Sequence, residues 1–181
     1  MQSNSKAGRL TRRRFVVAGV MGGVAAAIGC SAHKRGNRDF LSEDEARTLG
    51  AICDQIVPAD DFPSATQAGV LTYIDRQLVR HYRRHQDAYR DGLRQADAMS
   101  MKRFGHELAA LTRQQQFEVV SAMESEESGF FEMVRRHTLE GYYGSPRHGG
   151  NRDAVSWRML GLAEPPLLGR AQYNLGKGSG E

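Results

Sequence analysis

A histidine pair on a helix is the first feature of this 181-residue chain whose spacing could do chemistry. His81 and His85 are four residues apart, a spacing that lets two imidazoles hold one metal ion. They lie among Arg80, Arg83 and Arg84, whose positive charge opposes the binding of a cation. The pattern therefore favours a solvated, basic helix face over a metal site.

Other polar residues offer acid–base or ligand chemistry only in part. Asp60 and Asp61 are too few to coordinate calcium and suit a turn before Pro63. His137 and His148 could move protons because histidine titrates near neutrality, but core and loop histidines are commoner than catalytic ones. Haem-attachment, cysteine-cluster and dinucleotide motifs are missing from the sequence. We therefore expect no catalytic residue, no metal and no cofactor in this chain.

The glycine-rich segment 144–153 is the most unusual part of the sequence. Gly149 and Gly150 indicate a tightly shaped turn, because glycine adopts backbone conformations that other residues resist. Tyrosine, tryptophan and arginine often dominate protein interfaces. Two compatible interpretations follow, a capped turn stapled by a tryptophan and a docking surface. The docking candidates are Tyr142, Tyr143, Arg147, Gly149, Gly150, Asn151, Arg152 and Trp157.

The first 29 residues are typical of an export signal. Arg12 and Arg13, followed after one residue by Phe15, resemble the twin-arginine motif, and the apolar run 15–29 comes next. That run is shorter than the roughly 18–20 residues that span a bilayer. We therefore expect a cleavable signal, residues 1–29, and export by the twin-arginine translocase to the periplasmic side of the cytoplasmic membrane.

Cys30 follows a segment, Ala27 to Gly29, that resembles the lipobox of lipoproteins, although Ala27 stands where leucine is usual. Three outcomes are open: acylation of Cys30, cleavage near Ala32, and retention of the leader as an anchor. The other cysteine, Cys53, lies on the apolar side of a predicted helix and is expected to be a buried core thiol.

The charge distribution argues against a nucleic-acid partner. The chain carries a formal charge of +4, with 25 basic and 21 acidic side chains. Five basic residues and no acidic one lie in the first 29 positions, which leaves 20 basic against 21 acidic residues in the body. Without surplus positive charge, counterion release provides no general affinity for a polyanion.

Helical periodicity runs through the body of the chain and predicts an all-α fold of five to six helices. Capping boxes at Ser42 and Thr112 mark two helix starts, and Pro58 ends the first helix. The expected helices cover a segment between the Ser42 capping box and Pro58, about 66–82, about 86–103, a segment after 112, about 128–143 and about 155–160. Residues 30–39 are expected to be a tether, 40–166 the domain and 167–181 a flexible tail.

Two blocks of sequence resemble one family. Residues 52–78 contain Ile-Val-Pro-Ala-Asp-Asp and then Tyr73-Ile74-Asp75; residues 130–158 contain His-Thr-Leu-Glu-Gly-Tyr-Tyr, Gly-Gly-Asn-Arg and Trp157-Arg158. Both blocks are similar to the gluconate 2-dehydrogenase subunit 3 family over roughly residues 40–166.

The resemblance implies a non-catalytic small subunit of a membrane-associated dehydrogenase complex. Its large subunit would be an FAD-dependent flavoprotein of the glucose–methanol–choline type that oxidises sugars, sugar acids or polyols. A cytochrome c subunit, which carries haem, often accompanies it. The small subunit would help the flavoprotein to be exported, matured and stabilised. The alternative is an independent exported lipoprotein that acts as a periplasmic binding module.

Overall fold

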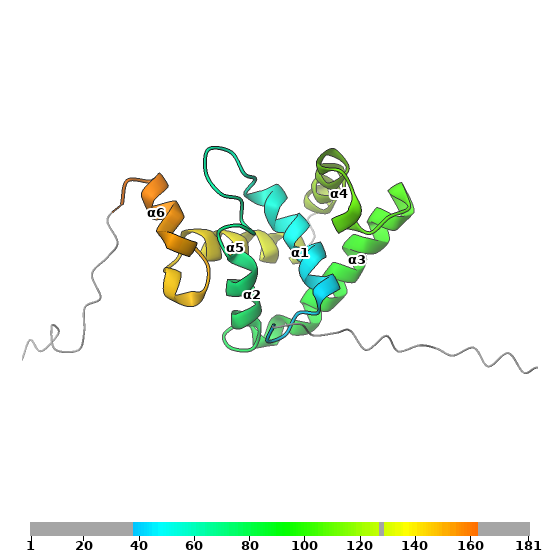
Figure 1. Cartoon of the computed structure of the whole chain (residues 1–181). Helices are drawn as coiled ribbons and strands as arrows, with labels where there is room; N and C mark the ends of the chain where they lie inside the picture. Colours follow the sequence, from blue (N-terminus) through cyan, green and yellow to red (C-terminus); the bar gives the residue numbers. More distant parts are fainter. Residues whose placement is uncertain (1–37, 127–128, 163–181) are drawn as a thin grey trace, which may run out of the picture. The chain divides into compact units, whose positions relative to one another are not determined.

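The computed structural model describes residues 38–126 and 129–162, and these residues form an all-α domain (Figure 1). The predicted fold class is confirmed, since the described ranges contain six α-helices and no strand. The export-signal residues Arg12, Arg13 and Phe15, the candidate acylation site Cys30 and the tail 167–181 lie outside the described residues. The helices are α1 (Glu43–Ile56), α2 (Val70–Leu78), α3 (Gln86–Phe104), α4 (Arg113–Ser125), α5 (Gly129–Tyr143) and α6 (Val155–Met159).

Helix α1 is central to the domain, because it packs against α2, α3, α4 and α5. It begins with the predicted capping box: the Ser42 hydroxyl accepts a bond from the Glu45 amide at 3.2 Å, and the Glu45 carboxylate accepts one from the Ser42 amide at 2.8 Å. Leu49 and Ile52 are fully buried in the core. Among the described residues, no helix is both long enough and apolar enough to cross a membrane.

The thiol of Cys53 lies inside this core, as predicted. Its side chain is fully buried, and its sulfur lies 3.3 Å from the hydroxyl oxygen of Thr138 on α5. Burial penalises the thiolate and raises the pKa of Cys53 to about 12. The thiol is therefore a packing group and has almost no nucleophilic character near neutral pH.

Helices α3, α4 and α5 begin and end within about one residue of their predicted limits where those were given. The capping box at Thr112 is present, with Gln115 as its partner. One side chain differs from the periodic pattern: Phe117 is 55% exposed, although Val120 and Met123 on the same helix are buried.

Helix α2 is shorter than predicted at both ends, so the predicted range 66–82 was wrong. At its start, Asp54 accepts bonds from the amide and the hydroxyl of Thr66, at 2.8 and 2.7 Å, and holds a turn there. Gly69 then has φ +85°, a left-handed conformation that no helix interior allows. At its end, the carbonyl of Leu78 accepts a bond from the Gln86 side chain at 2.8 Å, which leaves a turn before α3.

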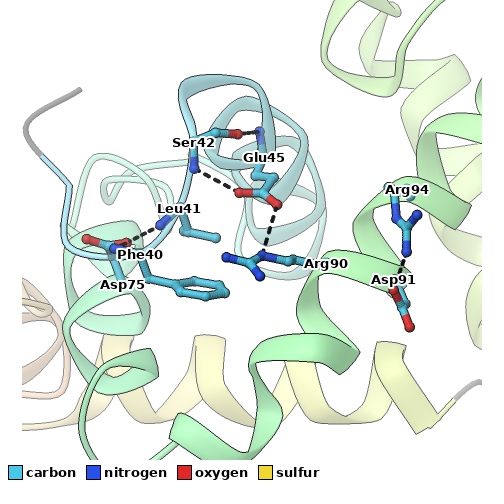
Figure 2. A network of polar contacts seen from close by, with 8 residues as sticks. All are labelled: Phe40, Leu41, Ser42, Glu45, Asp75, Arg90, Asp91 and Arg94. Carbon is cyan, nitrogen blue, oxygen red and sulfur yellow. Dashed lines mark hydrogen bonds and ion pairs between the residues drawn. The ribbon is translucent and has the colours of Figure 1, made fainter. Parts of the chain in front are cut away.

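A buried carboxylate fixes the point at which the chain joins the domain. Asp75 on α2 is 4% exposed and accepts backbone bonds from Asp39 at 2.7 Å, Phe40 at 3.0 Å and Leu41 at 2.8 Å. Figure 2 shows this carboxylate beside the segment that precedes α1. The Phe40 ring also lies under the guanidinium of Arg90, 4.7 Å from its centroid. We call this arrangement the Asp75 clamp.

We predict that Asp75→Asn strongly destabilises the domain. The amide keeps one acceptor oxygen and turns an N–H group toward backbone donors, and each lost charge-assisted bond contributes about 1.5–3 kcal/mol. The expected loss in urea unfolding is about 3 kcal/mol. Asp91→Asn is the matched control, because Asp91 is exposed and pairs only with Arg94 (Figure 2), and its expected effect is below about 0.5 kcal/mol. Equal losses for the two variants would contradict the clamp.

Candidate docking surface

The glycine-rich loop leaves the end of α5, makes two short 3₁₀ turns, Pro146–His148 and Arg152–Ala154, and leads into α6. It packs back on α2, because the amide of Arg152 donates a 2.8 Å bond to the carbonyl of Ala68. That carbonyl lies just before the start of α2, so the loop and the shortened helix are coupled.

Asn151 organises the loop from inside. Its side chain is fully buried, and its amide nitrogen donates to the Gly144 carbonyl at 2.8 Å. Its amide oxygen accepts from the Ser156 amide at 2.9 Å, in the first turn of α6. One side chain thus joins the end of α5 to the start of α6, and it satisfies backbone groups that burial would otherwise leave without partners.

Glycines allow the loop to approach its neighbours closely, as the sequence predicted. A Cβ on Gly150 would stand 2.1 Å from the carbonyl oxygen of Gly141 on α5, and Gly149 has φ +100°. A Cβ on Gly69 would stand 2.8 Å from the Gly149 carbonyl. No larger residue fits at either contact without moving backbone.

Three residues of the loop other than glycine adopt positive φ angles: 44° at Asn151, 56° at Asp153 and 53° at Ala154. Such conformations cost of order 1–3 kcal/mol each for ordinary residues and persist only where the surroundings impose them. Here the Asn151 bonds impose them, together with a bond from the Arg158 guanidinium to the Asp153 carbonyl. The loop is a strained but firmly held frame.

Two aromatic residues fasten this frame to the domain. The indole nitrogen of Trp157 donates to the Tyr143 carbonyl at 2.9 Å, so the predicted tryptophan staple is present. The hydroxyl of Tyr142 donates to the Pro63 carbonyl at 2.8 Å, and its ring is buried. The end of α5 is thereby tied both to α6 and to the loop that contains Asp60.

The structure divides the eight docking candidates into two groups. Tyr142, Gly150 and Asn151 are buried and hold the loop from beneath. Tyr143, at 42% exposure, Arg147 and Arg152 are exposed, and Gly149 and Trp157 are half-buried. The sequence analysis missed two exposed leucines after α6, Leu160 at 55% and Leu162 at 56%. Their place in the sequence, just after Trp157 and next to Gly161, could have indicated that they extend the docking surface.

A second cluster of titratable groups lies where α2, α3 and α5 meet, and the sequence analysis did not assemble it. The hydroxyl of Tyr82 donates to the carboxylate of Glu140 and lies 2.8 Å from the hydroxyl of Tyr73. The ring of Tyr82 stacks on His137 at 3.8 Å between centroids, with 6° between the planes. The ring of Tyr89 lies parallel to the imidazole at 5.9 Å between centroids, and its hydroxyl is 2.9 Å from His137 Nδ1.

These surroundings keep His137 neutral. Burial is the main cause that lowers the pKa of His137 to about 4; the Glu140 carboxylate opposes this, and the cations of Arg136 and His85 add to it. The imidazole is 1% exposed. It serves as a buried packing and hydrogen-bonding group.

The ring of His85 lies against this cluster, with its centroid 5.7 Å from that of His137 and 6.3 Å from that of Tyr82. His148 is exposed in the loop, and no hydrogen bond links it to His137 among the described residues. His81 is exposed, and the Nε2 atom of His85 accepts a bond from Arg84. Within residues 38–126 and 129–162, no group of three or more histidine, cysteine or acidic residues could hold a metal ion.

A groove of about 640 Å³ lies beside the stacked rings, between the start of α3 and α5. Phe130, Met133 and Leu139 provide apolar surface, while the remaining walls carry both signs of charge: His85, Glu132, Arg135, Arg136 and Glu140. With opposing charges on its walls, the groove selects neither anions nor cations.

The fold and the loop together define a small all-α domain that presents arginines and aromatic side chains from a rigid frame. The chain belongs to the gluconate 2-dehydrogenase subunit 3 family, which matches residues 43–163 and confirms the resemblance of the two sequence blocks. This family consists of subunits of dehydrogenase complexes, so membership implies a dehydrogenase partner. No characterised protein and no solved structure matches the chain.

We predict that Asn151→Gly destabilises the domain by about 2 kcal/mol, because it removes two buried hydrogen bonds worth about 1 kcal/mol each and keeps the backbone freedom. Asn151→Ala should cost about 1 kcal/mol more, since alanine resists the positive φ angle. Thermal unfolding measures both. Arg147→Ala is the control and should change stability by less than about 0.5 kcal/mol. The linking role of Asn151 is refuted if Asn151→Gly unfolds like the wild-type chain.

We also predict that His137 makes the domain less stable in acid. The imidazole takes up a proton with its ordinary pKa of 6.5 when unfolded, but only near 4 when folded. Stability should therefore fall as pH drops from 6.5 toward 4, by about 2.5 kcal/mol at pH 4.5. Urea unfolding at pH 7.5 and 4.5 tests this, with His137→Gln as the comparison. The explanation fails if the variant loses as much stability between these pH values as the wild type.

Proposed function

We propose that this chain is the non-catalytic small subunit of a membrane-associated, FAD-dependent dehydrogenase of the glucose–methanol–choline type, acting on sugars, sugar acids or polyols. The observation that carries the proposal is the family match over residues 43–163, which contains Asp75 and the glycine-rich loop. The FAD would lie in the large subunit, and a cytochrome c subunit with haem would receive the electrons.

In this proposal the loop surface docks on the flavoprotein. Arg147, Arg152 and Tyr143 provide charged and aromatic contacts of the kind that dominate interfaces, and the two leucines after α6 add apolar surface. The buried Asn151 bonds and the Trp157 staple hold these groups in place before binding. A surface that is ordered in advance loses less conformational entropy on association.

The proposal also includes export. The twin-arginine leader would carry the chain, folded together with a flavoprotein that has no signal of its own, to the periplasmic side of the cytoplasmic membrane. Acylation of Cys30, or retention of the leader, would then hold the complex at the membrane. Support for this part comes from the sequence alone, since residues 1–37 lie outside the described ranges.

Purification of the tagged full-length chain from gently solubilised membranes of its host tests the subunit role. A yellow complex with a co-purifying flavoprotein and dye-linked dehydrogenase activity is the expected result. Recovery of a colourless, solitary chain in good yield would contradict it and favour the alternative, an independent exported lipoprotein.

We predict that the double variant Arg147→Ala, Arg152→Ala reduces the amount of recovered flavoprotein by about tenfold or more, because each interface arginine contributes about 1–2 kcal/mol. The folded domain should keep its thermal stability. The matched control is Arg94→Ala, Arg103→Ala, two exposed arginines on α3, which should recover the flavoprotein normally. Equal recovery with both pairs would exclude the loop as the docking surface.

A further inference from the structure

The turn between α2 and α3 carries a concentration of positive charge that the proposed docking loop does not use. Residues 76–90 contain five arginines and one carboxylate, Asp87. Arg80, Arg83 and Arg84 are all exposed, and none of them forms an ion pair with another described residue. We call these three the basic turn.

The basic turn is held rigidly from below. Tyr82, in the middle of the turn, points inward, stacks on His137 and donates to Glu140, as described above. The amide of Tyr82 also donates a 2.8 Å bond to the carbonyl of Gln77 at the end of α2. Tyr82 is thus pinned inside, while Arg80, Arg83 and Arg84 on either side of it in the chain are exposed.

The basic turn lies at the end of the domain where the chain arrives from its leader. The Asp75 clamp holds Asp39 on α2 three residues before that helix ends, and the Phe40 ring packs under Arg90 in the first turns of α3. The turn connects these same two helix segments. Figure 1 shows the blue start of the described chain beside the green turn between α2 and α3.

The sequence before the clamp limits how far this end of the domain can lie from a membrane anchor. Eight residues, 31–38, separate Cys30 from Asp39, and the nine extended steps between these two positions reach at most about 32 Å. They include Lys34, Arg35 and Arg38 and no acidic residue. If the anchor is instead the apolar run that ends at Gly29, one more residue lengthens this reach by about 3.6 Å.

We propose that the basic turn docks on anionic phospholipid headgroups and so sets the orientation of the domain on the membrane. This inference rests on the membrane anchoring in the proposed function. Arginines near an anionic bilayer are attracted to it over about a Debye length, and the short tether keeps them within reach. The clamp fixes the point of attachment, because it binds residues 39–41 to Asp75 on α2 and packs Phe40 under Arg90 on α3.

Two labelled positions in the full-length chain test the orientation. Val79→Cys, in the turn, and Met101→Cys, far along α3, replace exposed apolar residues of 37% and 50% exposure and leave every charge in place. Position 79 lies before the start of α3 at Gln86, and position 101 lies about 23 Å along that helix from Gln86. Cys53 is buried and stays unlabelled, and the labelled wild-type chain supplies the background from Cys30.

The spin-labelled chains are reconstituted in phosphatidylglycerol–phosphatidylcholine vesicles that contain a nickel-chelating lipid. We expect nickel to relax the label at position 79 much more strongly than the label at position 101. The preference should vanish in vesicles of phosphatidylcholine alone and in high salt, because it depends on anionic headgroups. Equal relaxation at the two positions in anionic vesicles overturns the proposal.

Charge reversal separates this role from the proposed subunit role. Arg80→Glu, Arg83→Glu, Arg84→Glu should shift the equilibrium between docked and free orientations by about 100-fold, since each arginine near the surface contributes about fivefold. The matched control reverses Arg94, Lys102 and Arg103 on α3 and should keep the preference. Flavoprotein recovery should be normal for both. If the basic-turn variant instead keeps its nickel relaxation pattern and loses the flavoprotein, the turn binds a protein and the membrane proposal is wrong.

Discussion

The Asp75 carboxylate imposes the constraint on which most of this domain depends. A charge buried to this degree is tolerable only if hydrogen bonds replace its water, and three successive backbone amides at Asp39, Phe40 and Leu41 do so. Meeting that requirement fixes where the chain arrives, places Ser42 to cap α1, and sets Phe40 under Arg90. One buried group therefore connects the start of α1 to α2 and places Phe40 against α3.

At the start of α2, close contact between backbone segments holds the glycine-rich loop in place. The loop after α5 rests on Gly69 and Gly141 with no room for a side chain, and Asn151 supplies the bonds that this packing removes from water. Helix α2 is thus short because both of its ends are committed to other segments. The exposed arginines and aromatic rings of the loop inherit their fixed geometry from these buried contacts.

Local signals in the sequence predicted much of the fold. Capping boxes at Ser42 and Thr112 located two helix starts, because their chemistry is complete within four residues. The limits of α2 escaped prediction, since they depend on Asp54, Gln86 and Arg152, which are distant in sequence. The loop was recognised as unusual, but residue type alone could not separate the buried Tyr142 and Asn151 from the exposed Tyr143 and Arg152. Asp75 carried an unused signal: with Leu71 four residues before it and Leu78 three after it, a carboxylate on the apolar side of a helix demands partners.

The buried thiol of Cys53 affects how the domain would respond to reducing and oxidising compartments. A chain that folds in a reducing cytoplasm and works in an oxidising periplasm, as proposed here, passes between opposite thiol chemistries without unfolding. Because Cys53 is enclosed between α1 and Thr138 and resists ionisation, it offers no thiolate for mixed disulfides with a partner or with Cys30. Within the described residues, the only cysteine is therefore buried and unreactive, and the folded domain would need no change in its thiol chemistry between the two compartments.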